Sequence, residues 1–506
     1  MFIGRGLTVH PFKKPVYVPR PLLDEIPGAT SAYGTTKLRA NYNGPCLRVR
    51  TIGGVANDVG FDSNGNIDEA TLNALHGGGT LYVITWYDQS GNGRDLTIPS
   101  FPSANPTRAG RIVVSGVIQK DIYGNVGLLY AGTQGATSEL EYLQHPTCFP
   151  ASSNTVVAHC QPVTNASIWF GHIYGATNHG LNWGANGQLD IMLYKDGGNS
   201  IGGQVTSWGG KPEGIIASTN LETSTNEIWQ NGMGSNINSK IITPFVPDTL
   251  IYVGYERKSF RYRLNGILTQ LVIYPKVFSR TECKIAWRNL KRTKSMPSPA
   301  FYLCDGDSLT QGSGSWRNYQ QRLQEAITDT SKIRVFWNDG VGGFRVDNMD
   351  SFASSVSTAP NDGKGMDFIQ YLEDVPERIL IAWGGANDFF QGRTGTSAYN
   401  NLVTYFTNRK AAVPYNQMGV VCTPPCGTVA NTNEAIVMND LIRTAMGPGG
   451  ALTNLGVTKL YDTWTLPEFD EHADTLNTTY YFDGTHFTIA GHNLIAGLIK
   501  TVEGLT

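Results

Sequence analysis

The tetrapeptide Gly306-Asp307-Ser308-Leu309 decides how the second half of this 506-residue chain is interpreted. It follows the apolar run 300–304, which predicts a buried strand, and it precedes Gly and Ser residues and a helix-like segment over 316–327. We therefore expect a serine on a tight turn between a strand and a helix, which is where α/β hydrolytic folds expose a nucleophile. An ordinary turn serine or a helix N-cap is the alternative for Ser308.

A serine nucleophile needs a neighbouring base, which is usually a histidine held by a carboxylate. Near the C-terminus, Asp483 and His486 lie three residues apart, beside Gly484. A loop there would let the carboxylate reach one ring nitrogen and would leave the other nitrogen for Ser308. A plain turn with a solvated histidine is the alternative. His492 is expected on a helix surface beyond this loop.

Hydrolysis of an acyl group also needs hydrogen-bond donors for the negative oxygen that develops on the substrate. Two Gly-rich segments, 338–343 and 384–388, follow the apolar strand-like runs 333–337 and 378–383. In an open α/β sheet, ligands bind beyond the carboxyl ends of the strands, so both turns are expected at one edge. Their glycines and Asn387 are the candidate donors, with a structural turn as the alternative.

These four segments, in this order, resemble the four blocks of the SGNH (GDSL) hydrolase family over roughly residues 298–506. The strand and proline-rich loop at 420–425 also resemble that family. The resemblance implies a three-layer α/β/α domain with a flavodoxin-like parallel sheet. It also implies that Ser308 is the nucleophile and that Asp483 and His486 complete a catalytic triad.

The resemblance further implies an oxyanion hole made of the Ser308 N–H, the Gly343 N–H and the Asn387 side chain. The second block departs from the family, because a Ser-Gly-Asp-like turn is common there and this chain has Gly-Gly-Phe. The donor among Gly340, Gly342 and Gly343 therefore stays open. Asp307 and Asp388 are expected to make structural hydrogen bonds beside the site.

Composition argues against several classes of protein. The net charge is −2 and no long basic run occurs, so a nucleic-acid partner is not expected. No stretch is long enough to span a membrane, and residues 1–20 lack the apolar segment of a signal peptide, so we expect a soluble protein. Seven scattered cysteines favour reduced thiols. Cys422 and Cys426 lack a second Cys/His pair, so a zinc site is not expected. The serine mechanism expected here requires neither a metal nor a cofactor.

Proline-rich segments divide the chain into three parts. Residues 1–30 contain five prolines and are interpreted as an extended arm. A basic stretch followed by Pro-Ser-Pro at 291–299 marks a boundary, which gives domains over 31–294 and 295–506. Short alternating runs predict that 31–294 is an all-β jelly-roll sandwich. These runs are 80–86, 155–159, 190–194, 250–254 and 268–274, and Asn-Gly turns are expected at 64–65, 231–232 and 265–266.

Residues 33–50 and 85–93 resemble the concanavalin-like module of fungal-type α-L-arabinofuranosidases, which also occurs in phage tail proteins. The last strand and short helix also suit a laminin-G-like sandwich. We do not carry over glycosidase chemistry, because no second acid forms the carboxylate pair that it needs. Trp86, Tyr87 and Asp88 are candidate carbohydrate-binding residues. Burial in the core is the alternative for the aromatics, and loop structuring is the alternative for Asp88.

Together these observations predict a serine esterase that removes O-acetyl groups from a carbohydrate. The resemblance to phage modules suggests a tailspike deacetylase located in the virion tail. Its substrate would be O-antigen or capsule polysaccharide, and it would form a homotrimer whose arm contacts other tail proteins. Two alternatives stay open. One is a lipase- or thioesterase-like enzyme of the same family, and the other is a glycan-binding module with an inactive esterase domain.

Overall fold

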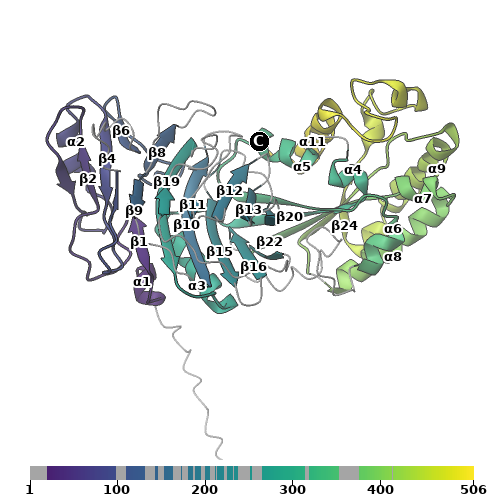
Figure 1. Cartoon of the computed structure of the whole chain (residues 1–506). Coiled ribbons are helices and arrows are strands. Elements are labelled where there is room, and N and C mark those ends of the chain that lie inside the picture. The colour runs from purple at the N-terminus through teal and green to yellow at the C-terminus, as the bar shows by residue number, and fades with distance from the viewer. Residues whose placement is uncertain are drawn as a thin grey trace, which may run out of the picture.

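The chain combines a region of antiparallel strands with a region of parallel strands and helices (Figure 1). The computed structural model describes residues 20–98, 110–131, 143–145, 153–162, 172–173, 181–185, 189–194, 200–205, 211, 213–220, 225–231, 233–237, 251–253, 265–313, 318–352, 375–412 and 414–506. The antiparallel region precedes β20 (Pro299–Gly306), and the parallel region begins with that strand.

Sixteen of the described N-terminal strands belong to one hydrogen-bonded network, and every pair in it is antiparallel. Three more strands pair with one another in the order β12-β13-β14. The strands are β1 Ser31–Gly34, β2 Leu47–Arg50, β3 Asn57–Val59, β4 Leu81–Trp86, β5 Leu96–Thr97, β6 Arg111–Val114, β7 Val117–Ile118, β8 Leu128–Ala131, β9 Leu143–His145, β10 Asn154–Pro162, β11 His172–Ile173, β12 Leu181–Ala185, β13 Leu189–Tyr194, β14 Ser200–Val205, β15 Glu213–Asn220, β16 Thr225–Gln230, β17 Met233–Ile237, β18 Ile251–Val253 and β19 Asn265–Tyr274.

The folded N-terminal region begins earlier than the predicted arm allows. Leu22–Glu25 forms the short helix α1, and Leu22, Leu23 and Ile26 are buried. The Arg20 carbonyl accepts a hydrogen bond from Asn289 Nδ2 (2.9 Å) on helix α3 (Arg280–Thr293). The prediction of an arm is therefore wrong for residues 20–30, because their apolar side chains enter the core. Residues 1–19 lie outside the described chain.

Two of the three predicted Asn-Gly turns lie between structural elements. Gly65 has φ +80° and donates to the Asp62 carbonyl (3.1 Å), and Asn231, with φ +52°, follows β16 and precedes β17. Asn265 and Gly266 instead begin β19, where Gly266 pairs with Tyr130 of β8. The strand register overrides the local turn preference at that position.

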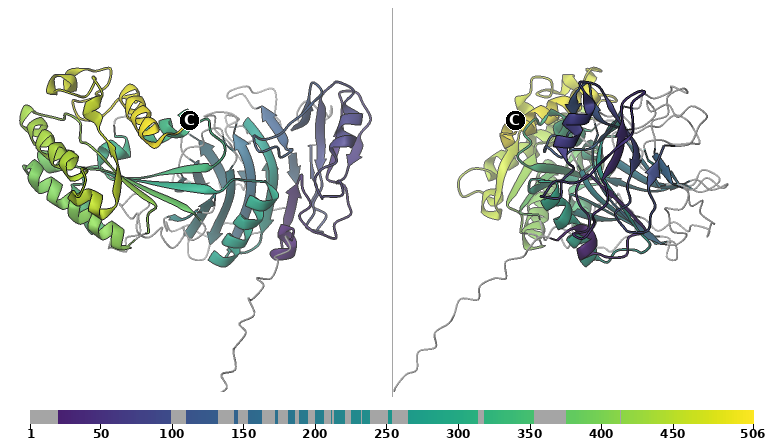
Figure 2. Two further views of the ribbon diagram at one scale, coloured as in Figure 1. Left: turned by 180° about the vertical axis from the view of Figure 1, so that it is seen from behind. Right: turned by 90° about the vertical axis from the view of Figure 1, so that its left-hand side faces the viewer.

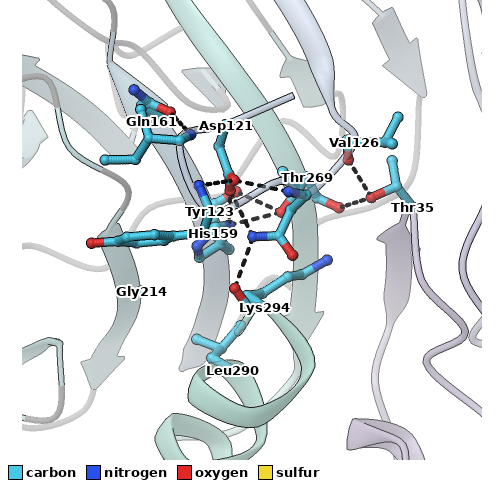
Figure 3. Close-up of polar contacts among 12 residues, drawn as sticks. Thr35, Asp121, Tyr123, Val126, His159, Gln161, Gly214, Thr269, Leu290 and Lys294 are labelled. Carbon is cyan, nitrogen blue, oxygen red and sulfur yellow. Dashed lines mark hydrogen bonds and ion pairs between the residues drawn. The ribbon is translucent and has the colours of Figure 1, made fainter. Parts of the chain in front are cut away.

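A buried polar cluster joins the end of α3 to the antiparallel sheet (Figure 3). Lys294 is completely buried, and its Nζ donates to Thr36 Oγ1 (3.2 Å). Asn125 Nδ2 donates to the Lys294 carbonyl and to Asp121 Oδ2, at 2.8 Å in each case. Burial lowers the pKa of Lys294 to about 8, although attraction to the Asp121 carboxylate opposes this change. These bonds hold the residue that follows α3 inside the antiparallel region.

The C-terminal sheet has five parallel strands in the order β21-β20-β22-β23-β24. In chain order this is 2-1-3-4-5, the order of flavodoxin-like doubly wound sheets. Every residue of β20 is buried, as expected for a central strand that is covered on both faces. The strand order reverses between β20 and β22, and this reversal creates the crevice where such sheets bind ligands. The other strands are β21 Ile333–Gly340, β22 Glu377–Trp383, β23 Gln417–Val421 and β24 Val457–Tyr461.

Helices cover both faces of this sheet, so the region has three layers (Figures 1 and 2). Helix α5 packs against α11 on one face, and α8 packs against α6 and α9 on the other. Among the described helices, none is long and apolar enough to cross a bilayer. The remaining helices are α2 Glu69–His76, α4 Ser308–Gln311, α5 Tyr319–Ala326, α6 Val346–Phe352, α7 Ala386–Phe390, α8 Gly395–Ala412, α9 Val429–Ala445, α10 Ala451–Leu455 and α11 Ile489–Glu503, with 3₁₀ turns at Thr463–Thr465 and His472–Leu476.

Candidate active site

Ser308 lies where the sequence predicts it, on the turn between β20 and a helix. Its helix is the short α4, which begins at Ser308 itself, so the serine N–H is in a first turn without an intrahelical acceptor. Asp307 caps this helix, because its Oδ1 accepts the Leu309 N–H (2.9 Å). Ser308 is 8% exposed, so the nucleophile candidate is held firmly but is not sealed from solvent.

The loop before α11 brings Asp483 and His486 to this serine. His486 Nε2 lies 2.9 Å from Ser308 Oγ, and His486 Nδ1 lies 2.7 Å from Asp483 Oδ2. Asp483 Oδ1 also accepts the backbone N–H groups of His486 (2.8 Å) and Thr485 (3.1 Å). Gly484 has φ +79°, a conformation that lets the chain double back between the two side chains. The carboxylate, imidazole and hydroxyl therefore form one continuous hydrogen-bonded series.

The charge of Asp483 suits the role of orienting a histidine. Partial burial raises the pKa of Asp483, but the hydrogen bonds from the backbone and ring of His486 outweigh this effect. The net result is a lowered pKa, so the group is a carboxylate at neutral pH. A carboxylate beside Nδ1 fixes the tautomer that leaves Nε2 as a base, and it stabilises the imidazolium that forms after proton transfer.

A second loop supports the one that carries the histidine. Tyr481 is buried, and its hydroxyl donates to the Pro425 carbonyl (3.0 Å). The Gly427 N–H donates to the Gly484 carbonyl (3.0 Å). The strand and proline-rich segment noticed at 420–425 therefore lead into direct contacts with the loop that carries Asp483. Sequence reasoning assigned no such supporting role to Tyr481.

The turn after β21 brings glycine N–H groups beside the serine. Phe344 donates its backbone N–H to the Val341 carbonyl (3.2 Å), and Gly343 occupies the left-handed region with φ +83°. The Gly340 N–H donates to the Asn338 side chain (3.0 Å), so it is not available to a substrate. This bond leaves the two glycines at 342–343 as the candidate donors.

Gly342 is the residue of this turn that lies alongside the nucleophile. A Cβ atom on Gly342 would lie 3.9 Å from Ser308 Cβ and 2.8 Å from Gln311 Oε1. A Cβ atom on Gly343 would meet nothing within 4 Å, but its positive φ would strain any other residue. Position 343 therefore favours glycine because of its backbone conformation. A side chain at position 342 would lie at ordinary contact distance from Ser308 and would displace only the end of the flexible Gln311 side chain.

Asn387 reaches the same turn from the neighbouring strand end. It lies in the first turn of α7, directly after β22, and its Nδ2 donates to the Phe344 carbonyl (3.0 Å). The second hydrogen on Nδ2 is left for another acceptor. Gly385 immediately precedes this helix with φ +127°, a conformation that other residues rarely adopt. The β20 and β22 ends therefore bring Ser308 and Asn387 to the reversal point of the sheet.

Two buried carboxyl groups lie behind these loops. Burial raises the pKa of Asp307 to about 7, an effect opposed by the Leu309 N–H and strengthened by the nearby Asp388 carboxylate. Burial also raises the pKa of Asp388, against a hydrogen bond from the Val346 N–H. Both side chains accept backbone N–H groups, as expected for structural hydrogen bonding beside the site.

His492 is not on a helix surface, and that prediction is wrong. It lies in α11 and is completely buried, with its ring edge-on to Phe487 at 5.6 Å between centroids. Burial lowers the pKa of His492 to about 3, so the ring is neutral. The face of α11 that carries His492 packs inward, and helical periodicity around one polar residue could not reveal this.

The candidate sugar-binding residues lie elsewhere, at the end of β4. Trp86 is completely buried, so its ring cannot stack on a sugar, and that candidate is withdrawn. The Tyr87 hydroxyl donates to Asp58 Oδ1 (2.7 Å). Asp88 is 5% exposed and accepts the backbone N–H groups of Ala32 and Ser90, both at 2.9 Å. Its bonds are those of a residue that structures the surrounding loops.

Comparisons with known proteins concern the two regions separately. Residues 304–494 match the model of the GDSL-like Lipase/Acylhydrolase family. No curated protein matches the chain. Among solved structures, a GH54 α-L-arabinofuranosidase soaked with a cyclic sulfate inhibitor has 14% identity and a TM-score of 0.40, over 54% of this chain and 64% of its own. A member of the lipolytic G-D-S-L family from Veillonella parvula has 19% identity and a TM-score of 0.30, over 40% of this chain and 97% of its own.

The chain spans less than two thirds of the length of that arabinofuranosidase, and similarities at these levels assign no activity. The family match is more informative, because its bounds include the end of β20, both Gly-rich turns and the loop that carries Asp483 and His486. The parallel sheet and the hydrogen-bonded series at Ser308 agree with that match. Residues 304–494 therefore form a GDSL-like lipase/acylhydrolase domain, from a family of enzymes that hydrolyse esters.

Proposed function

We propose that this protein is a serine esterase that removes O-acetyl groups from a carbohydrate. The esterase part rests on one observation, the hydrogen-bonded series from Ser308 Oγ through both nitrogens of His486 to Asp483 Oδ2. A hydroxyl in contact with an imidazole, which is in turn held by a carboxylate, is the arrangement that activates serine nucleophiles.

In the proposed mechanism, Ser308 Oγ attacks the acyl carbonyl while His486 Nε2 takes the hydroxyl proton. Asp483 holds the ring and stabilises the imidazolium. The negative oxygen of the tetrahedral intermediate accepts hydrogen bonds from the Ser308 N–H, from the turn at 342–343 and from the Asn387 amide. His486 then gives its proton to the departing alcohol and later activates the water that hydrolyses the acyl-enzyme.

The carbohydrate part rests on the resemblance of residues 31–95 to the concanavalin-like module of α-L-arabinofuranosidases, which also occurs in phage tail proteins. A tailspike deacetylase acting on O-antigen or capsule polysaccharide is the biological setting that we propose. In that setting the protein would be a homotrimer in the virion tail, with its N-terminal residues in contact with other tail proteins.

Acetate release from O-acetylated bacterial polysaccharide, followed by NMR, tests this proposal. We expect the wild-type chain to release acetate and Ser308→Ala to release none above background. Ser313→Ala is a matched control, because Ser313 lies near the same turn and its hydroxyl donates to the Gln311 side chain (3.2 Å). The backbone N–H of Ser313, which donates to the Ser308 carbonyl (3.1 Å), is unchanged by this substitution. An active Ser308→Ala protein would reject the serine mechanism, and a wild type that cleaves p-nitrophenyl acetate but no polysaccharide would reject the substrate.

An enzyme acting on apolar acyl esters is the second candidate, favoured by two exposed phenyl rings beside the site. Phe482 precedes Asp483 and is 65% exposed, and Phe390, on the helix of Asn387, is 45% exposed. Apolar surface of this kind suits a fatty acyl chain as well as the C–H face of a sugar. Activity on p-nitrophenyl esters from acetate to octanoate separates the two, because an acetylesterase loses activity as the chain lengthens.

A further inference from the structure

Asn387 and Asp388 are consecutive residues of α7, and they bond to the segment that follows β21, from the loop at Phe344 to the start of α6 at Val346. Asn387 Nδ2 donates to the Phe344 carbonyl (3.0 Å), and Asp388 Oδ2 accepts the Val346 N–H (2.9 Å). The two bonds engage backbone groups two residues apart. They therefore fix both the distance and the rotation of the loop relative to the first turn of α7.

This loop begins with the glycine turn that supplies the candidate oxyanion donors. Phe344 closes that turn through its bond to the Val341 carbonyl (3.2 Å), so the turn and the two bonds to α7 share Phe344. A shift of residues 344–346 would carry the glycine N–H groups away from the Asn387 amide. Oxyanion stabilisation depends on donors that are already aimed at one point, so this alignment affects the rate directly.

Asp388 is costly to bury, which makes a merely incidental contact a poor explanation. The residue is completely buried, and its Oδ1 has no hydrogen-bond partner in the described part of the chain. A buried carboxyl group with an unsatisfied oxygen destabilises the fold unless its other bonds compensate. Arg393 and Arg345 attract it, whereas Asp347 and Asp307 repel it.

We propose that Asp388 is a positioning residue for the oxyanion hole, acting through its hydrogen bond to the Val346 N–H. This inference rests on the proposed serine esterase mechanism. In the proposed mechanism, Asp388 touches no reacting atom. Its carboxylate holds the loop so that the turn at 342–343 and the Asn387 amide face the same oxygen.

Kinetics of the full-length chain with p-nitrophenyl acetate test the inference. For Asp388→Ala we expect kcat to fall by about 10–10²-fold, because misplacement by about 1 Å can cost that much, while KM stays within about twofold. For Asp388→Asn we expect kcat within about threefold of wild type, because the amide oxygen can still accept the Val346 N–H. Titration of Ser308 with a fluorophosphonate gives the concentration of folded sites, which separates lost alignment from lost protein.

Asp347→Ala is the matched control, since Asp347 follows Val346 in the first turn of α6 but its half-buried side chain pairs with Arg345 and Arg393 (2.9 and 2.8 Å). We expect its kcat to stay within about twofold of wild type. An Asp388→Ala protein with a lower melting temperature but normal kcat per titrated site would overturn the inference, as would equal losses in the Asn and Ala variants. Either result leaves the serine mechanism intact, whereas an active Ser308→Ala protein would reject that mechanism itself.

Discussion

Two clusters in this chain each bring together a hydroxyl, an imidazole and a carboxylate, yet only one is arranged for catalysis. In the C-terminal region, His486 uses its nitrogens separately. Nε2 lies 2.9 Å from Ser308 Oγ, and Nδ1 lies 2.7 Å from Asp483 Oδ2. The ring therefore connects the carboxylate to the hydroxyl. Nε2 can accept the Ser308 proton while the Asp483 carboxylate stabilises the ring from Nδ1.

In the N-terminal region, Thr269 and Asp121 meet the same nitrogen of His159. Thr269 Oγ1 lies 2.8 Å from Nδ1, and Asp121 Oδ2 lies 3.9 Å from it (Figure 3). Nε2 is buried and has no hydrogen-bond partner within the described chain. Burial lowers the pKa of His159 well below its ordinary value and raises that of Asp121. This cluster cannot relay a proton and no substrate can reach it.

The comparison teaches that residue types do not define a catalytic triad. The order of the bonds around the imidazole and access for a substrate distinguish the two clusters. The buried cluster around His159 stabilises the fold, since Asp121 also accepts hydrogen bonds from the turn beside Lys294. Each cluster should therefore respond differently to the same kind of substitution.

Removal of the histidine should distinguish the two clusters most clearly. His486→Ala should lower kcat for p-nitrophenyl acetate by about 10⁴–10⁶-fold, because the serine loses its base. His159→Ala should leave kcat per folded molecule within about twofold, while costing roughly 2–4 kcal/mol of stability through the cavity it leaves. Steady-state kinetics, scaled by the folded fraction from near-ultraviolet circular dichroism, give both numbers. Comparable losses of turnover in the two variants would contradict the conclusion that only the His486 cluster is catalytic.

Removal of an oxyanion donor should give the next largest effect. Asn387→Ala should lower kcat by about 10²–10³-fold with little change in KM, since the amide acts on charge that appears only in the transition state. Asn416→Ala is the control, because Asn416 accepts the Arg378 N–H (2.8 Å) at the opposite end of β22. A normal kcat in Asn387→Ala would place the donors elsewhere.

Loss of the carboxylate in the buried cluster should affect stability alone. Asp121 accepts the N–H groups of Tyr123 and Asn125 and the Asn125 side chain, all within 2.9 Å. Asp121→Ala should therefore lower the free energy of unfolding by roughly 2–4 kcal/mol. Denaturant titration measures this cost, and esterase assays on the folded protein should show no change. A loss of turnover at full folding would mean that the antiparallel region takes part in catalysis.

Asp307→Asn should leave turnover nearly unchanged but should alter the pH dependence of stability. The folded-state pKa of Asp307 is raised from 3.8 to about 7, mainly by burial. Between these values the unfolded chain releases the proton and the folded chain keeps it, so wild-type stability falls as pH rises through this window. The amide cannot ionise and still caps α4. Melting temperatures of both proteins from pH 4 to pH 8 should therefore favour the variant increasingly up to about pH 7, and a constant difference would disprove the shift.

The C-terminal half could be predicted well because each of its motifs lies within a few consecutive residues and the motifs follow one another in the order of the family's blocks. Apolar runs followed by Gly-rich turns place Ser308 and Asn387 at strand ends, and a parallel sheet brings those ends together. The Asp-x-x-His spacing likewise suits a loop that folds back on itself. The family resemblance supplied the roles, and the family match agrees with it over residues 304–494.

Other features depend on packing that a single sequence does not reveal. His492 reads as a surface histidine, but the inward face of α11 is decided by α5 and the sheet. A tryptophan such as Trp86 can either stack on a sugar or fill a hydrophobic core, and only its burial decides between these two roles. Gly340 is excluded as a donor only by its contact with Asn338, which depends on side-chain orientation at the end of β21.

The short junction between the two regions has a consequence for polymer substrates. Residues 294–298 are all that separates α3 from β20, and Lys294 and Met296 within them are buried. A connector anchored at two points leaves little freedom for the halves to swing apart. If the antiparallel half binds a polymer, the rigid junction would keep the bond that reaches Ser308 at a fixed distance along that polymer from the bound segment.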